Sequence, residues 1–169
     1  MPEDFKCNDG GVKPCIDGIR DMKENDLEGI LAIEKTSFIT PWTKTMFREE
    51  LSIPICVNRV AVAGDSIVGY SCFAIVFDES HLRNIAVHRN WRRKGVAECL
   101  LKDMICISIK RGACMATLEV RKSGIPAQRL YEKTGFRIAG LRPRYYSDTD
   151  EDALIMTVEL QPFLSETEN

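Results

Sequence analysis

Long apolar runs are missing from this 169-residue sequence, and so is any large excess of charge of one sign. A membrane-spanning helix needs roughly 20 consecutive apolar residues, and no segment comes near that length. The first six residues hold no apolar stretch of the kind that a secretory signal contains. The formal net charge of −2 gives no reason to expect a nucleic-acid partner. We therefore expect a cytoplasmic protein that binds neither a membrane nor a nucleic acid.

Metal-binding sequence patterns are missing too. The seven cysteines include no C-x-x-C pair, so we expect no structural zinc site and no resident metal. Cys7 and Cys15 flank a Gly-Gly pair near the N-terminus, where a disordered tail is the first interpretation and a reactive or metal-linked role is the alternative. Four others lie in apolar segments and are interpreted as small buried hydrophobic residues: Cys72, Cys99, Cys106 and Cys114.

Length and composition indicate a single domain with a true core. Hydrophobic residues make up 44% of the chain and charged residues 28%, which is typical of a globular protein. Residues 1–17 contain Gly and Pro with little periodicity, and we predict that they form a flexible lead-in. The domain should then cover residues 18–162, with a polar C-terminal tail over 163–169.

Hydrophobic periodicity predicts two helices in the first third of the domain. The first should be capped by Asn25 and end near Phe38, because Pro41 cannot continue a helix. The second should run from Thr43 to Leu51. Three of its side chains should face the core: Met46, Phe47 and Leu51.

Strands and helices alternate along the rest of the chain. Strands are expected at 57–63, 67–77 and 82–87, the first two joined by the hairpin signal Gly64-Asp65. A helix over 96–111, a strand over 116–120 and a helix over 125–134 should follow, and then two strands near 136–146 and 153–160. This order predicts an α/β fold with a mixed sheet covered by helices on both faces.

The most informative segment lies between the strand that ends at Val87 and the helix that begins by Val96. It is basic and holds one glycine, Gly95, at the expected helix start. A helix N-terminus presents unpaired amides and the positive end of its dipole, and a glycine lets a phosphate approach the backbone. The segment matches neither a Walker A loop nor a G-x-G-x-x-G fingerprint. By itself it predicts a diphosphate site, with a basic surface loop as the alternative.

The pattern R-x-x-G-x-A, placed after a strand ending in Asn-Ile-Ala-Val, resembles the acyl-CoA-binding signature of the GNAT acetyltransferase superfamily. The resemblance implies a GNAT-like, mostly antiparallel twisted sheet and acetyl-CoA as the co-substrate. It also implies that Ile85, Ala86 and Val87 offer backbone hydrogen bonds to the acetyl-pantetheine arm. The residues expected around the pyrophosphate are Arg92, Arg93, Lys94, Gly95, Val96, Ala97 and Glu98.

Residues 118–123 and 127–136 resemble the "LEVR-S-N … A-x-x-LYEK-x-GF" segment of the ribosomal-protein-alanine acetyltransferases, and 142–146, 151–156 and Pro41-Trp42 extend the match. Those enzymes acetylate the N-terminal amine of a ribosomal protein. The resemblance implies direct attack by such an amine, with Glu119 as general base and Tyr131 as general acid. For Glu119 the alternatives are a partner of Arg121 or a half-solvated strand residue, and for Tyr131 the alternative is a core tyrosine.

The resemblance departs at Gly124, where the family has an asparagine that is expected to touch the cofactor. One hydrogen bond to the cofactor should therefore be missing or supplied by water. Trp42, Tyr145 and Tyr146 are candidates to line a peptide groove, with core or loop packing as the alternative.

The two histidines, His81 and His88, take no part in this interpretation, and catalysis by histidine is a minority alternative. Two other functions stay open at the level of sequence. One is acetylation of a small-molecule amine, and the other is a non-catalytic acyl-CoA-binding module. The acceptor protein and the oligomeric state also stay open.

Overall fold

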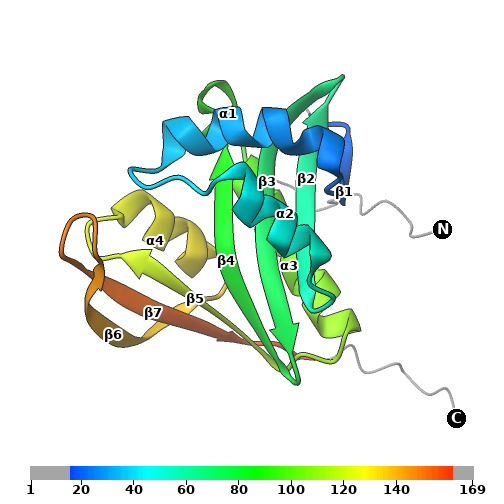
Figure 1. The fold of residues 1–169 in the computed structure, drawn as a ribbon. Coiled ribbons are helices and arrows are strands. Elements are labelled where there is room, and N and C mark those ends of the chain that lie inside the picture. The colour runs from blue at the N-terminus through cyan, green and yellow to red at the C-terminus, as the bar shows by residue number, and fades with distance from the viewer. Residues whose placement is uncertain (1–15, 162–169) are drawn as a thin grey trace, which may run out of the picture.

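A seven-stranded sheet forms the centre of the structure, a computed structural model that describes residues 16–161 (Figure 1). The strand order is β1-β2-β3-β4-β5-β7-β6. Within the described residues only β4 and β5 pair in parallel, and every other neighbouring pair is antiparallel. The strands are β1 (Gly18–Asp21), β2 (Cys56–Ala63), β3 (Ser66–Val76), β4 (Glu79–Val87), β5 (Met115–Arg121), β6 (Arg137–Tyr146) and β7 (Glu151–Glu159).

Helices cover both faces of this sheet, as the sequence predicts. Figure 1 shows α1 (Leu27–Ser37) and α2 (Lys44–Ser52) in front of the sheet and α3 (Val96–Lys110) behind it. The first two helices bury Ile30 and Phe47 against Tyr70 of β3. Helix α4 (Ile125–Lys133) follows β5 and packs against the same hydrophobic cluster as α3. The predicted mixed, mostly antiparallel α/β fold is confirmed.

Details of the first two helices differ from the prediction. Asn25 lies inside a short 3-10 turn, Glu24–Asp26, so it does not cap α1, and Asp26 stands at that position. Thr43 does cap α2, since its side chain accepts a hydrogen bond from the Met46 amide at 3.3 Å. Met46 itself is 40% exposed, so its predicted inward placement is wrong. The buried side of this short helix carries Phe47 and not its neighbour in the sequence.

Strand β1 was not predicted, because four residues are too few to show an alternating pattern. It pairs antiparallel with β2, and the preceding Asp17 already donates its amide to Val62 at 2.8 Å. The remainder of the predicted lead-in, with Cys7 and Cys15, lies outside the described residues. The predicted tail 163–169 lies outside them as well, so the domain boundaries stay a prediction.

The cysteine interpretation is correct for Cys72 and Cys99, which are buried. It is wrong for Cys106, which is half-buried, and for Cys114, which is exposed. Cys114 lies in the turn that joins α3 to β5, where the neighbouring Ala113 provides the buried side chain. In the described part of the chain no helix is both long enough and apolar enough to cross a membrane.

The divergence of β4 from β5 is the feature that creates a site. The two strands pair only at Glu79–His81 with Met115–Thr117, and beyond this point they separate (Figure 1). Strand β5 then pairs along its whole length with β7. The edge of β4 that faces β5 therefore has no strand partner from Leu82 to Val87, which leaves main-chain groups there without a sheet hydrogen bond.

The ion pair before α1 gives a test of the fold. Arg20 donates two hydrogen bonds of 2.8 Å to Asp26, which also accepts the Lys23 amide at 2.7 Å. The bond from Arg20 holds the pKa of Asp26 below its usual value. A carboxyl with a lowered folded-state pKa stabilises the fold above its unfolded-state pKa, and this contribution is lost as the pH falls through the lowered value.

We therefore expect Asp26→Asn to lower the free energy of unfolding by about 1–2 kcal/mol at neutral pH. The difference from the unmodified protein should shrink in strong acid, as the pH falls through the lowered pKa of Asp26 and the wild-type carboxyl is protonated as well. Urea unfolding at the two pH values measures both quantities. Asp65→Asn, at an exposed turn position, is the control and should change stability by less than about 0.5 kcal/mol. An equal loss at both pH values would contradict the electrostatic origin.

Candidate active site

A cavity of about 500 Å³ lies where β4 and β5 separate. Its walls come from α1 and the α1–α2 loop, from β4, β5 and α4, and from the β6–β7 loop. Seven of the residues singled out in the sequence line it: Trp42, Ile85, Glu119, Gly124, Tyr131, Tyr145 and Tyr146. The structure thus brings both predicted catalytic residues and all three candidate peptide-binding aromatics to one place.

Glu119 points from β5 into this cavity. The apolar Leu118 and Val120 on either side of it are buried on the other face of the strand, and its own side chain is 11% exposed. Its Oε2 lies 2.6 Å from His81 Nε2, and its Oε1 lies 3.4 Å from Arg142 Nε. Its position suits a carboxylate that exchanges a proton with a group in the cavity.

Arg121 is not the partner of Glu119, so that alternative is wrong. Its guanidinium pairs with Asp148 at 2.7 Å and lies 3.5 Å from Glu151. It also lies 4.0 Å from the centre of the Tyr146 ring. Arg121 therefore ties the end of β5 to the β6–β7 loop that walls the cavity.

Tyr131 lines the cavity from α4 and is only 6% exposed. Its ring packs against Phe136 at a centroid distance of 6.1 Å. Burial raises the pKa of its hydroxyl well above the usual value for tyrosine. Within residues 16–161 no group forms a hydrogen bond to this hydroxyl. The phenol is therefore protonated at working pH and is free to donate its proton to a ligand.

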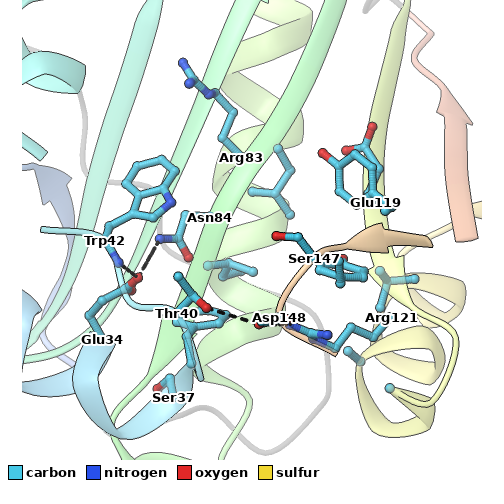
Figure 2. A pocket seen from close by; sticks show the side chains of 18 of the residues that line it. Glu34, Ser37, Thr40, Trp42, Arg83, Asn84, Glu119, Arg121, Ser147 and Asp148 are labelled. Carbon is cyan, nitrogen blue, oxygen red and sulfur yellow. Dashed lines mark hydrogen bonds and ion pairs between the residues drawn. The ribbon is translucent and has the colours of Figure 1, made fainter. Parts of the chain in front are cut away.

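Glu34 fixes the opposite wall, as Figure 2 shows. This buried carboxylate of α1 accepts the Trp42 amide at 2.7 Å, the hydroxyl of Tyr70 and the Asn84 side chain at 3.3 Å. Burial raises its pKa. The network joins α1, β3 and β4 and holds the α1–α2 loop at the cavity. Trp42 also packs on Phe47 at 5.3 Å, so it is both a cavity residue and part of the core.

The two loops that border the cavity touch each other. Thr40 of the α1–α2 loop donates a hydrogen bond of 3.3 Å to Asp148 of the β6–β7 loop (Figure 2). Next to Asp148, Tyr145 and Tyr146 meet edge to face at 5.2 Å. Tyr146 is the more buried of the two, and burial raises its pKa to about 12. The side chain of Tyr145 is 47% exposed. The exposed ring of Tyr145 is available to a substrate at the mouth of the cavity.

The main-chain groups of β4 divide between its two edges. His88 donates its amide to Val68 of β3 at 2.8 Å. Antiparallel pairing alternates, so Ala86 also directs its main-chain groups toward β3. Ile85 and Val87 then direct theirs to the unpaired edge. Of the three residues predicted to offer backbone hydrogen bonds, Ile85 and Val87 face the open edge, where the Val87 carbonyl also accepts from Arg92, and Ala86 faces β3.

The predicted phosphate turn does lead into a helix N-terminus. Gly95 caps α3 with φ of 80°, a left-handed conformation that glycine adopts without strain. The first helical bond is accepted by Gly95 from Cys99 at 3.1 Å. The amides of Val96, Ala97 and Glu98 therefore precede the first helical hydrogen bond and have no acceptor within the helix. The Val96 side chain is buried, so only its backbone can meet an anion.

The charged side chains of this turn are partly engaged. Arg92 donates to the Val87 carbonyl and to the Ser37 hydroxyl, both at 3.2 Å, and so joins the turn to β4 and α1. Lys94 lies over the Trp91 ring at 5.1 Å. Arg93 is exposed and has a positive φ of 63°. Glu98 pairs with Lys133 at 2.6 Å, which lowers its pKa and neutralises an acidic group at this helix end.

Gly124 stands at the start of α4. A Cβ at this position would lie 3.1 Å from the Arg121 carbonyl oxygen, which is closer than most real contacts. The side chain of Gln128 holds the same loop by donating to the carbonyls of Arg121 and Lys122 at 3.0 and 2.9 Å. An asparagine at position 124 would therefore need a small shift of this loop.

Sequence reasoning missed His81, Glu34 and Asp148. The contact of His81 with Glu119 depends on the parallel register of β4 and β5, which no local pattern reveals. Glu34 comes after the apolar positions of its helix, and nothing in the sequence distinguishes it from an ordinary exposed glutamate. No group of three or more His, Cys, Asp or Glu in the described residues is arranged to hold a metal.

Comparison with known proteins agrees with this geometry. The sequence model of the acetyltransferase (GNAT) family matches residues 27–136. The ribosomal protein bS18-alanine N-acetyltransferase of Escherichia coli K12 is 33% identical over 144 residues, which cover 84% of this chain and 97% of the relative.

Two solved structures give the same result for the fold. The crystal structure of the ribosomal-protein-S18-alanine N-acetyltransferase from Escherichia coli has a TM-score of 0.79 and 31% identity, and covers 89% of this chain and 97% of that one. Arabidopsis thaliana NAA60 in complex with acetyl-CoA has a TM-score of 0.77 at 18% identity, with coverages of 83% and 98%, and supports the fold alone. The chain therefore belongs to the acetyltransferase (GNAT) family.

Proposed function

We propose that this protein transfers the acetyl group of acetyl-CoA to the α-amine of a protein N-terminus that begins with alanine, in the manner of a ribosomal-protein acetyltransferase. The observation that carries the proposal is the cavity between β4 and β5, into which both Glu119 and Tyr131 project. The names of its bacterial relatives support the same acceptor class.

Acetyl-CoA fits the features beside this cavity. The unpaired edge of β4 at Ile85 and Val87 can pair with the amide groups of the pantetheine arm. The free amides at the start of α3 suit a pyrophosphate, because they combine hydrogen-bond donors with the positive end of the helix dipole. Arg93 adds positive charge without a competing ion pair among the described residues. The arm would then bring the acetyl group into the cavity.

The chemistry requires two proton movements. An α-ammonium group loses two protons when it becomes an amide nitrogen, while the departing CoA thiolate gains one and the solvent receives the other. Glu119 takes the proton that frees the amine lone pair for attack on the thioester carbonyl, directly or through water. Tyr131 gives its proton to the thiolate, and the second proton that the nitrogen loses as the amide forms reprotonates the tyrosinate through water. The raised pKa of Tyr131 keeps its phenol protonated until the thiolate forms, while the same burial makes it a weaker acid than a free phenol.

An N-terminal amine suits a carboxylate base. The reference pKa of an α-amine is about 7.7–8.0, so roughly a tenth of it is neutral at pH 7. A lysine amine, near 10.4, is neutral in less than about one part in a thousand. Direct attack in a ternary complex needs only positioning and one modest base when the acceptor is an α-amine. The exposed Tyr145 offers contact area for the residues that follow the acceptor.

The acceptor assignment is tested with three peptides that share one sequence after position 1. One begins with a free alanine, one begins with an acetylated alanine and keeps an internal lysine, and one has proline at position 1. We expect CoA release and a gain of one acetyl group, located on the α-nitrogen by mass spectrometry, with the first peptide only. Turnover with polyamines or amino sugars but with no peptide would show a small-molecule enzyme instead. CoA binding without turnover on any amine would indicate a non-catalytic module.

Substitutions of Glu119 and Tyr131 should change the pH dependence of the reaction in different ways. Glu119→Gln should lower kcat/KM by about 10²-fold or more near pH 6.5 and by less near pH 9, where the amine is already neutral. Tyr131→Phe should lower kcat at every pH, because the raised pKa of Tyr131 leaves it protonated throughout. The dissociation constant of CoA should change less than about 2-fold in both. Glu132→Gln, exposed on α4, is the control. A loss of CoA affinity as large as the loss of activity would contradict these roles.

A further inference from the structure

His81 is the side chain in closest contact with Glu119, and the chemistry described above does not use it. It lies on β4 at the last residue that pairs with β5, opposite Thr117. Its Nε2 lies 2.6 Å from Glu119 Oε2, within hydrogen-bond range. The carboxylate is 11% exposed and the imidazole is 41% exposed. The imidazole therefore connects a shielded carboxylate to solvent.

We propose that His81 is a positioning and proton-relay residue for Glu119: it orients the carboxylate and passes the proton taken from the substrate to water. The inference rests on the proposed function, since it assumes that an amine loses a proton in this cavity. It adds an exit path for the one proton that each turnover releases.

The need for such a path follows from the proton count. Once Glu119 has taken a proton from the ammonium, its carboxyl must lose that proton before the next turnover. In the Nδ1–H tautomer of neutral His81 the carboxyl O–H passes its proton to Nε2, and the resulting imidazolium donates Nε2–H to the carboxylate. The proton that then leaves comes from Nδ1, and the exposed ring resets its tautomer by proton exchange with water. No electrons move, and the cycle ends with Glu119 ionised and one proton in solvent.

The other contact of Glu119 cannot serve as this path. Arg142 lies 3.4 Å from Oε1, and a guanidinium stays charged and has no lone pair for a proton. It can orient the carboxylate but cannot carry a proton away. An imidazole both accepts and releases protons near neutral pH. Of the two neighbours of Glu119, Arg142 can therefore only orient the carboxylate, whereas His81 can also carry a proton away.

The charges around His81 come from three strands. Glu119 faces it from β5, and Arg142 reaches the same carboxylate from β6. Arg83, on β4 itself, pairs with Glu50 at 2.7 Å, which neutralises its charge locally. Tyr146 of β6 interacts electrostatically with Glu119. The net result is one carboxylate held between an imidazole and a guanidinium.

Two variants separate positioning from relay. His81→Gln keeps an N–H donor for Glu119 Oε2 but cannot carry a proton, whereas His81→Ala removes both functions. We expect kcat to fall about 10-fold in His81→Gln and further in His81→Ala, which is part of the roughly 10²–10⁴-fold that general base catalysis provides. The KM for the peptide and the CoA dissociation constant should stay within about 2-fold. Glu79→Gln, at an exposed position two residues earlier on β4, is the matched control.

Rescue by imidazole distinguishes a relay from a structural role. Adding imidazole to the assay should raise the rate of His81→Ala several-fold in proportion to its concentration, and should not raise the rate of Glu119→Gln. The rate deficit of His81→Gln should also widen as buffer concentration is lowered. Unchanged kcat in both histidine variants, or a loss that imidazole does not restore in a variant with wild-type melting temperature, would overturn the proposal.

The failure of this inference is distinct from failure of the proposed function. If the wild-type protein acetylates only a small amine, the peptide assignment fails and the same variants test the relay with that amine. If the wild-type protein acetylates the alanine peptide and His81 proves dispensable, the relay alone fails. If it acetylates no amine, there is no proton to relay and both are overturned.

Discussion

The separation of β4 from β5 is the constraint on which the rest of the structure depends. Three residues of each strand pair in parallel, and β5 then follows β7. This leaves one edge of β4 without main-chain partners inside an otherwise continuous sheet. Unpaired main-chain groups in a sheet interior are costly unless a ligand or water satisfies them. The same divergence creates the space that Glu119 and Tyr131 line, so the proposed binding and the proposed chemistry share one structural origin.

The walls of the cavity are held by polar contacts that reach across the fold. Glu34 joins α1 to β3 and β4, and Arg121 joins β5 to the β6–β7 loop. The bond between Thr40 and Asp148 connects the two bordering loops directly. Charged groups near the site are thus mostly paired with one another, while the hydroxyl of Tyr131 is left to the ligand. This arrangement holds the proposed acid, the buried Tyr131, and the proposed base, the shielded Glu119, at one cavity.

Local sequence signals predicted the fold well where they were long or strongly patterned. The helix over Val96–Lys110 and the strands that surround it have clear hydrophobic periodicity. The start of this helix was also predictable, because Gly95 and the basic residues before it are typical of a helix N-terminus that binds an anion. Strand β1 was missed because four residues carry no period. Met46 and Cys114 were misplaced because a short helix and a turn each bury one neighbour and expose the next.

The meeting of Glu119 and Tyr131 at one cavity was predictable because residue identity and a known family pattern coincide there, while their catalytic roles stay a prediction. Contacts that depend on the register between strands, or on loops far apart in the sequence, cannot be predicted from the residues around each partner. The approach of His81 to Glu119 follows from how β4 and β5 are aligned, and the direction of Ala86 follows from the pairing of β3 with β4. Arg92 illustrates a further limit, because its charge suggested an anion contact while its guanidinium also joins the turn to Val87 and Ser37.

The central claim is that one cavity receives both the acetyl group and an α-amine between β4 and Glu119. A crystal structure with a bisubstrate analogue, in which CoA is joined through its acetyl group to the α-nitrogen of an alanine peptide, tests it most directly. We predict the diphosphate on the amides of Val96, Ala97 and Glu98, and the α-nitrogen within one water molecule of Glu119. A complex in which CoA avoids the open edge of β4, or in which the α-nitrogen lies outside the cavity, would contradict the account.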